Sequence, residues 1–310
     1  MTELIRPSRV YQNHHLDSTR WERYVPRDGD VVISTSYKAG TTWTQTIVAN
    51  LVFQDGELPG GVTEISPWLD MRVRPADEMF ARIEAQTHRR FLKTHLALDG
   101  IPIHEKVQYI VVGRDARDVF MSLWNHYSHH TREALAMLNG TPGRVGDPLP
   151  PCDGDIRALW HNWITRGWFE WEHDGWPYWS HLHHAQSWWE WRHLPNILFV
   201  HYNDLLADLA GEMRRIAAWL AIHVPDASWP RIVDAATFDT MKRNAERIVP
   251  EADMLWKGGA RTFINKGTNG RWRDVLTADD LALYPKAVAR SLSPDCARWL
   301  EAGRTAQRPD

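Results

Sequence analysis

The fold is decided by the stretch Thr35-Ser36-Tyr37-Lys38-Ala39-Gly40-Thr41-Thr42-Trp43. It joins a short β-branched strand, Val31–Ser34, to an apolar-periodic helix predicted over Thr42–Gln54. A strand that delivers a small-residue turn onto a helix N-terminus leaves backbone N–H groups unpaired, and the helix dipole favours an anion beside them. Lys38 adds a full positive charge at this turn. The stretch therefore predicts a phosphate-binding loop of the P-loop type.

The order of residues in this loop indicates which phosphate it fits. A loop that hydrolyses nucleoside triphosphates reads G-x-x-x-x-G-K-[ST], with its lysine after the last glycine. Here Lys38 precedes Gly40, and the first glycine is missing. The loop therefore fits a single 5′-phosphate-type group better than a triphosphate chain. Taken alone, the stretch also fits an ordinary tight strand-to-helix turn.

Composition and charge limit the class of protein. The chain has 310 residues, 43% hydrophobic and 24% charged, which is ordinary globular composition. We expect one domain over residues 1–310, with its core at about 27–300. A formal net charge of −3 gives no general field for nucleic acid. Two distant cysteines make no disulfide framework, and neither a signal peptide nor an apolar run of spanning length is recognisable. We expect a cytoplasmic protein without a membrane span.

Short apolar strands alternate with helical patterns, which predicts a parallel β-sheet flanked by helices on both faces. The strands are predicted at Val31–Ser34, Arg90–Lys93, Gln108–Gly113 and Ile197–His201. After the first helix, others are predicted at Ala116–His130, Ile156–Glu172, His181–His193, Leu205–Leu220 and Asp280–Ser291. Asp115 and Asp204 are expected to be N-caps.

Three segments stand out from this alternation. Leu138–Gly154 is rich in glycine and proline, which predicts a long surface loop acting as a lid. Ala245–Gly270 has little periodicity and combines glycines with basic residues, which suits closure over an anion. Nine of the 18 tryptophans fall between Trp160 and Trp191. Their mixed helical spacings favour a thick core, although flat rings also stack on ligands.

Four clusters of polar residues fall at the carboxyl ends of predicted strands, where open α/β sheets bind ligands. The first is the Lys38 loop. In the second, Lys93 and His95 lie two residues apart, so an extended chain points both to one face. The third has Arg114 at the tip of a strand and Ser122 two helical turns later, and the fourth is the basic loop 263–272.

These four clusters, in this order, resemble the cytosolic-type sulfotransferase family, and the chain is similar to a bacterial-like member of it from about Arg27 to about Thr277. Enzymes of that family move a sulfonate group from 3′-phosphoadenosine 5′-phosphosulfate (PAPS) to a small acceptor and release 3′,5′-bisphosphoadenosine (PAP). The resemblance implies PAPS as co-substrate, a hydroxyl-bearing acceptor, no metal and possible assembly as a homodimer. His181, His183 and His184 lack the accompanying ligands of a metal site.

The resemblance also implies roles for individual residues. His95 would be the catalytic base, Lys38 would stabilise the leaving group, and Lys93 would lie by the sulfonate oxygens. The implied cofactor-binding residues are Lys38, Ala39, Gly40, Thr41, Thr42, Trp43, Arg114, Ser122, Tyr202, Thr237, Phe238, Met241, Phe263, Asn265, Lys266 and Gly267. Trp124 and Tyr127, with the 138–154 loop and the tryptophans between 160 and 191, are expected to shape a pocket for a flat or apolar acceptor.

Two positions depart from the family pattern. Asn265-Lys266-Gly267 stands where the family usually has Arg-Lys-Gly, which removes one cation from the 3′-phosphate site unless Arg261 or Arg271 substitutes. Gly270-Arg271-Trp272 stands in place of the usual Gly-Asp-Trp. The animal-type dimer motif is not recognisable in 273–282, which leaves dimerisation through that segment open.

Two other functions fit parts of the pattern. A nucleotide kinase or ATPase built on the same loop would use ATP with magnesium, but the order of Lys38 and Gly40 argues against it. A non-catalytic binder would dock sugars or a partner chain on the tryptophan-rich segment.

Overall fold

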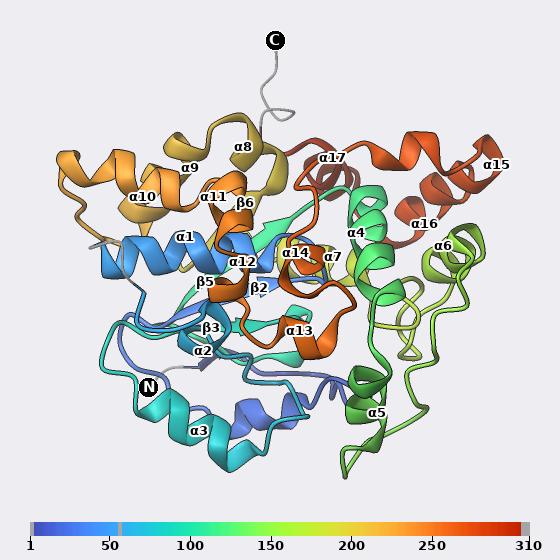
Figure 1. Cartoon of the computed structure of the whole chain (residues 1–310), viewed down its shortest axis with the longest axis horizontal. Helices are drawn as coiled ribbons and strands as arrows, with labels where there is room; N and C mark the ends of the chain where they lie inside the picture. Colours follow the sequence, from blue (N-terminus) through green and yellow to red (C-terminus); the bar gives the residue numbers. More distant parts are fainter. Residues whose placement is uncertain (1–2, 55–57, 305–310) are drawn as a thin grey trace.

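Four parallel strands form the central sheet of the computed structural model, which describes residues 3–54 and 58–304. The remaining positions of the predicted 1–310 domain lie outside the described residues. The strand order is β3-β2-β5-β6, with β2 at Val31–Thr35, β3 at Phe91–Thr94, β5 at Gln108–Gly113 and β6 at Ile197–His201. The parallel sheet and its four strands are confirmed, and Figure 1 shows them at the centre of the molecule with helices around them.

Alternate residues of each strand face two different hydrophobic cores, one on each side of the sheet. Val32 and Val111 pack into one core with helices α4 (Ala116–Ser128), α6 (Ile156–Thr165) and α7 (His181–Trp189). Val31 and Ile110 pack into the other with α1 (Thr41–Phe53), α9 (Leu209–Trp219) and α10 (Trp229–Ala235). A strand that is buried on both faces needs apolar residues at every position, which explains the continuous apolar runs in the sequence.

Shorter elements complete the fold. A small antiparallel pair joins β1 (Glu3–Ile5) to β4 (Ile103–His104). The remaining α-helices are α2 (Val62–Ile65), α3 (Ala76–Glu84), α5 (Arg132–Gly140), α8 (Tyr202–Ala207), α11 (Phe238–Arg243), α12 (Ala245–Ile248), α13 (Ala252–Leu255), α14 (Gly259–Phe263), α15 (Ala278–Leu281), α16 (Leu283–Ser291) and α17 (Pro294–Ala302). Short 3₁₀ helices are η1 (Ser18–Arg23), η2 (Leu98–Gly100), η3 (Asp226–Ser228) and η4 (Arg271–Asp274).

Several predicted helix boundaries are wrong for tertiary reasons. Helix α6 ends at Thr165 instead of Glu172. At Gly167 the chain turns back so closely that an added Cβ would lie 2.3 Å from the Glu172 carbonyl oxygen. The Glu172 carboxylate then accepts hydrogen bonds from backbone N–H groups of that turn. Helix α7 likewise ends at Trp189, four residues before the predicted end.

The predicted helix over Leu205–Leu220 is in fact two helices. The break lies at Asp208, whose side chain accepts from the Gly211 N–H and caps α9. Asp204 is therefore not an N-cap, and its carboxylate accepts from the Arg304 N–H instead. Asp115 does cap α4 as predicted, accepting from the Arg117 N–H.

Of the two segments predicted as loops, one contains helices and the other is mostly irregular. Ala245–Gly270 contains three short helices, α12, α13 and α14, which its weak periodicity did not reveal. These helices pack on elements from far earlier in the chain, α13 on α5 and α14 on α4, and Figure 1 shows the orange segment beside the green one. In Leu138–Gly154, helix α5 extends to Gly140, and the rest has neither helix nor strand.

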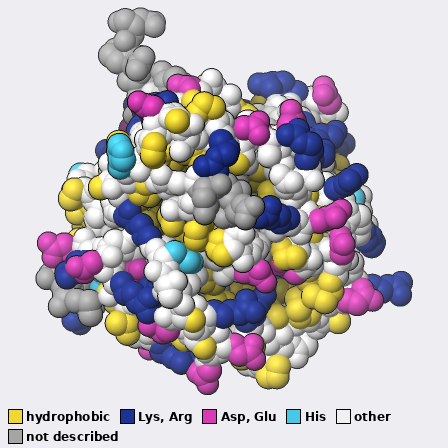
Figure 2. All heavy atoms as spheres, turned by 60° about the vertical axis from the view of Figure 1, so that its left-hand side comes forward, with side chains coloured by type: hydrophobic (Ala, Val, Ile, Leu, Met, Phe, Trp, Pro, Cys, Tyr) yellow, Lys and Arg dark blue, Asp and Glu magenta, His cyan; other side chains and the backbone are white. Residues whose placement is uncertain are grey.

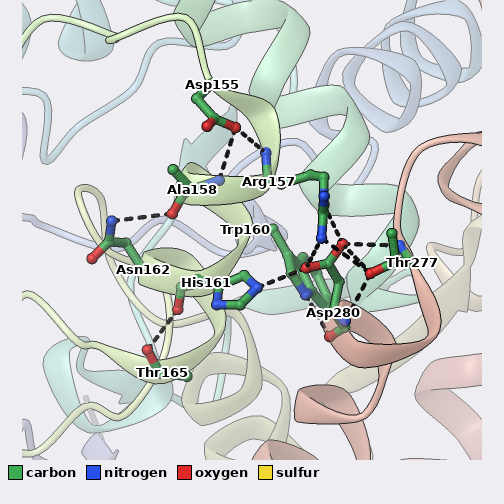
Figure 3. A network of polar contacts seen from close by, with 9 residues as sticks. All are labelled: Asp155, Arg157, Ala158, Trp160, His161, Asn162, Thr165, Thr277 and Asp280. Atoms are coloured by element: carbon green, nitrogen blue, oxygen red, sulfur yellow. Dashed lines mark hydrogen bonds and ion pairs between the residues drawn. The ribbon is translucent and has the colours of Figure 1, made fainter.

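The tryptophan-rich segment lies mainly in the core, as its spacing favoured. Trp160, Trp163 and Trp188 are buried. The Trp160 indole N–H donates to the Asp280 carbonyl at 2.8 Å, while the buried Asp280 carboxylate accepts from Arg157 Nε at 2.6 Å and His161 Nε2 at 2.7 Å. Figure 3 shows this network, which joins α6 to α15.

Candidate active site

A cavity of about 330 Å³ collects the residues that follow the carboxyl ends of the sheet strands. Lys38 follows β2, His95 follows β3, Arg114 follows β5 and Tyr202 follows β6. The four clusters that the sequence separates therefore meet at one place. The predicted site residues that line the cavity are Lys38, Gly40, Thr41, Thr42, Trp43, Lys93, His95, Arg114, Ser122, Tyr202, Phe238, Met241, Phe263, Asn265, Lys266 and Gly267.

The turn between β2 and α1 depends on a backbone that few residues tolerate. Gly40 has φ 123° and is the N-cap of α1. A Cβ added to it would lie 3.1 Å from the Tyr202 ring, so both the dihedral angle and the space favour glycine. Lys38 also has positive φ, at 69°. This turn presents the N-terminus of the 13-residue helix α1 to the cavity, where its N–H groups attract an anion.

The Lys38 side chain is half-buried and has no anionic partner among the described residues. Its Nζ donates to Nδ1 of His126 at 3.3 Å and lies 4.3 Å from the centre of the Phe263 ring. Burial, followed by the charges of Lys93 and Arg114, lowers the pKa of Lys38 to about 7. Since His126 accepts at Nδ1, its Nε2 donates to Tyr37 Oη at 2.8 Å. An anion in the cavity would supply the counter-charge that these contacts lack.

His95 is held in one tautomer. Its Nδ1 lies 2.8 Å from the Thr35 carbonyl oxygen, so Nδ1 carries the proton and donates it there. Its Nε2 consequently has a lone pair, and it has no hydrogen-bond partner among the described residues. Burial, then the charge of Lys93, lowers the pKa of His95 well below its usual value. The ring, which is 2% exposed, is neutral at physiological pH and able to accept a proton.

Lys93 lies on the aromatic side of the cavity. Its Nζ is 4.5 Å from the centre of the Trp68 ring, whose edge also contacts His95 at 4.6 Å between centroids. Burial lowers the pKa of Lys93 to about 8, with a smaller opposing effect from Glu251 and Asp70. A cation on an aromatic face beside the base can attract the oxygens of a small anion.

Arg114 is oriented by the loop that precedes η4. Its Nε and Nη2 donate to Asn269 Oδ1 at 3.0 and 2.7 Å, and its guanidinium lies 3.9 Å from the centre of the Tyr202 ring. Tyr202 in turn contacts the Trp43 ring edge-on at 5.0 Å. The two rings and the guanidinium line the same part of the chain's cavity, where aromatic rings can contact a planar base and a guanidinium can bind a phosphate.

Four predicted site residues do not line the cavity. Ala39 is buried in the turn, and Thr237 caps α11 by accepting from the Thr240 N–H. Trp124 is half-buried against the core. The Tyr127 hydroxyl donates to the Pro150 carbonyl, which ties α4 to the 138–154 segment. Of that segment, only Leu138 lines the cavity.

None of the tryptophans between 160 and 191 lines the cavity, although the Trp179 ring packs on Tyr37, Trp68 and His95, which do line it. The tryptophans that do are Trp43, Trp68 and Trp256. Trp160 and Trp163 instead pack in the core against Phe120 of α4.

Sequence reasoning missed much of the aromatic, histidine and apolar lining of the cavity. This lining comes from single residues of many segments, namely His15, Tyr37, Trp68, Met71, Val73, Met79, His126, His130, Ala134, Met137, Met254, Leu255 and Trp256. Most follow no motif. His126 and His130 could have been found, because they continue the four-residue spacing that begins at Ser122 on one face of the predicted helix.

Basic side chains dominate the charge of the cavity. Among the described lining residues, Glu251 is the one acidic side chain, whereas the basic ones are Lys38, Arg74, Arg82, Lys93, Arg114, Lys266 and Arg271. The outer surface is different, since Figure 2 shows lysine, arginine and acidic side chains interspersed on one face. The cavity therefore suits an anionic ligand although the whole chain is not basic.

Within residues 3–54 and 58–304, no group of three or more histidine, cysteine, aspartate or glutamate side chains is placed to hold a metal ion. No described helix is both long enough and apolar enough to span a membrane.

Comparisons with known proteins agree with this geometry. Residues 28–293 match the sulfotransferase domain family. A glycolipid sulfotransferase of Mycobacterium tuberculosis is 34% identical over 97% of this chain and 96% of its own length. Sulfotransferase 1A1 of Rattus norvegicus is 26% identical over 86% of this chain and 85% of its own.

Solved structures share the fold. Retinol dehydratase, solved with androsterone and the inactive cofactor PAP, superimposes with a TM-score of 0.68 at 24% identity, covering 89% of this chain and 84% of that one. Mouse sulfotransferase SULT7A1, solved with PAP, gives a TM-score of 0.67 at 18% identity, covering 90% of each chain.

Proposed function

We propose a specific chemistry for this chain, which belongs to the sulfotransferase family and is a PAPS-dependent sulfotransferase. The sulfonate passes in line to a hydroxyl of a small, largely apolar acceptor. His95 acts as the general base and Lys38 stabilises the leaving group. PAPS supplies the sulfonate and a phosphate leaving group. Residues of the chain remove the acceptor proton and stabilise the leaving group.

The fixed tautomer of His95 carries this proposal. A hydroxyl is a poor nucleophile while protonated, since a phenol has a pKa near ~10. The Thr35 carbonyl holds the proton of His95 on Nδ1, which leaves Nε2 to take the proton of an acceptor hydroxyl. Because Lys38 and Lys93 line the same cavity, the deprotonated oxygen would form beside the cations that hold the donor.

Lys38 suits the opposite end of the reaction. Negative charge grows on the oxygen that bridges the sulfur to the 5′-phosphate, and a preorganised cation helps most in the transition state. His126 and Phe263 hold the Lys38 ammonium at the mouth of the α1 turn, so little reorganisation is needed. Loss of one such donor typically costs about 2–4 kcal/mol of transition-state stabilisation.

The acceptor end supports an apolar or flat substrate. Trp68 and Trp256 offer rings, and Met71, Met137 and Met254 offer flexible thioethers that adapt to different shapes. Relatives fit this chemistry: one is named for glycolipids, and retinol dehydratase was solved with androsterone and with retinol. We propose that the acceptor is a molecule with a hydroxyl group on a ring system or on a flexible hydrocarbon tail.

Two binding and turnover experiments test the proposal. Purified protein is mixed with labelled PAPS and a panel of phenols, sterols and hydroxylated lipids, and sulfonated product is measured. Calorimetry then compares PAP with ATP plus magnesium. We expect turnover of apolar acceptors and binding of PAP. Absence of product with every acceptor, or binding of ATP with magnesium in preference to PAP, would count against the assignment.

The family resemblance leads us to propose two further properties, a cytoplasmic location and a homodimer. Cell fractionation tests the first. Light scattering on the full chain tests the second, and a monomeric mass at all concentrations would contradict it.

A further inference from the structure

We propose that Arg271 is a ligand of the 3′-phosphate of the donor nucleotide and replaces the cation that Asn265 removes. The inference rests on the proposed placement of that phosphate at Arg114 and Ser122. Position 271 usually holds an aspartate in the resembling family, so this chain lacks a positive charge at one loop position and gains one six residues later.

Arg261 and Arg271 could each replace the positive charge that is absent at Asn265, and their positions in the structure distinguish them. Arg271 lines the cavity together with Arg114, Ser122 and Lys266. Arg261 is exposed and does not line it. Only Arg271 is therefore placed to reach a bound nucleotide.

The guanidinium of Arg271 has no partner of its own. Its Nε is buried without a hydrogen bond, and no ion pair or hydrogen bond joins its side chain to any described residue. Asp118 is close enough to affect the pKa of Arg271, but its Oδ1 accepts the Gly270 N–H at 2.6 Å. A partly buried cation without a partner is costly, and an anion in the cavity would offset that cost.

The chain before Arg271 is tied to the same elements as Arg114. Gly270 has φ 82°, a left-handed backbone, and its N–H is fixed by Asp118 of α4. Asn269 accepts from Arg114 and donates to Asn203 Oδ1 at 2.6 Å. Both arginines therefore share one rigid support.

Charge explains why a phosphate monoester suits this pair. The two guanidiniums are near enough for the charge of Arg271 to add to burial in lowering the pKa of Arg114. A phosphate monoester carries about −1.5 to −2 charges at pH 7, enough to balance two cations. Arginine donors also match phosphate oxygens in geometry.

The test uses a pair of nucleotides that differ only in the 3′-phosphate. Calorimetry measures PAP and adenosine 5′-monophosphate on the full-length protein and on Arg271→Ala. We expect the variant to bind PAP about 10- to 100-fold more weakly, the range for one charge-assisted hydrogen-bonded contact. Its affinity for the monophosphate should change less than about threefold.

Three further variants make the result specific. Arg261→Ala is the matched control and should bind both nucleotides as the wild type does. Arg271→Lys should keep part of the PAP affinity and also tests the proposal if Arg271→Ala fails to fold. Adding Asn265→Arg to Arg271→Ala should recover PAP affinity by returning the missing cation.

Two outcomes would overturn the inference. One is unchanged PAP affinity in Arg271→Ala, or in Arg271→Lys if the alanine variant does not fold. The other is an equal loss for both nucleotides, which would assign Arg271 to the nucleoside or to the fold. Wild-type protein that bound neither nucleotide would instead contradict the proposed function, and the inference with it.

Discussion

Two groups suit His95 to the proposed role of general base, although neither would take part in the chemistry. The Thr35 carbonyl fixes the ring tautomer, and the surrounding aromatic rings exclude water and keep the imidazole neutral. The lowered pKa of His95 means that its neutral, proton-accepting form persists well below pH 6.5. Acidity alone should therefore not switch off the base near neutral pH.

Replacing this base separates catalysis from binding. We expect His95→Ala to reduce kcat by about 10²–10⁴-fold, the usual contribution of a general base, while PAP affinity stays within about twofold. Single-turnover kinetics and calorimetry measure the two quantities. His223→Ala, at an exposed histidine, is the control. Activity close to wild type in His95→Ala would exclude the proposed role.

Binding of the nucleotide should also take up protons. The pKa of Lys38 is about 7 and that of Lys93 about 8 without ligand, so above pH 7 a fraction of these amines is neutral. An anion beside them favours the charged form and raises both pKa values. We expect net proton uptake on PAP binding at pH 8, greater than at pH 6.

Calorimetry in buffers with different ionisation enthalpies measures this uptake. Lys38→Ala should reduce it, because one of the two titrating amines is gone. Proton release, or uptake that is the same in the variant, would contradict the account of a half-buried and unpaired ammonium.

At the scale of elements, the turn from β2 to α1 is a closely constrained joint in the site. Gly40→Ala would need a backbone with φ 123° and would bring a Cβ to 3.1 Å from the Tyr202 ring. We expect weaker PAP binding, by at least about tenfold, together with a lower Tm.

Gly143 offers a matched control for this joint. It also has positive φ, at 79°, but an added Cβ would meet nothing within 4 Å. Gly143→Ala should lose some stability and keep nucleotide binding. If both variants bound PAP equally well, the close fit of the turn to Tyr202 would not matter for the site.

The contribution of the α6–α15 contact to stability should depend on pH. The Arg157 hydrogen bond is the largest of several contacts that lower the pKa of Asp280, so its stabilising effect is full above the unfolded pKa near ~3.9. That effect is lost as pH falls through the lower folded pKa. Asp280→Asn should reduce Tm by a few degrees at pH 7 and by less near pH 3.

Thermal unfolding across pH measures this difference. Asp279→Asn changes the neighbouring exposed carboxylate and should leave Tm unchanged. An equal Tm for wild type and Asp280→Asn at pH 7 would mean that the network in Figure 3 does not stabilise the fold.

At the scale of the whole molecule, most residues that we propose for the nucleotide could be predicted from the sequence, whereas most residues that we propose for the acceptor could not. The strands and the Lys38 turn are local signals, since β-branched runs and a glycine before a helix fix their own geometry. The acceptor end is built from single residues of α3, α5 and α13, such as Met79, Met137 and Met254. Nothing local marks these residues, because only long-range packing brings them together.

The errors in helix boundaries have the same origin. Residues 166–172 have helical periodicity, but Gly167 lies against the Glu172 backbone and turns the chain. Asp208 caps a helix that begins inside the predicted one. In both places a contact made by the folded chain replaces the conformation that local propensity favours.

Asn269, which accepts hydrogen bonds from Arg114, lies more than 150 positions after it in the sequence. The same Arg114 guanidinium donates to the Lys38 carbonyl oxygen at 3.4 Å. During synthesis, the turn between β2 and α1 is therefore made long before the loop that orients Arg114 for the proposed binding of the donor. Termination upstream of Phe263 would remove Asn269, so we expect the truncated chain to bind the donor poorly even if its sheet forms.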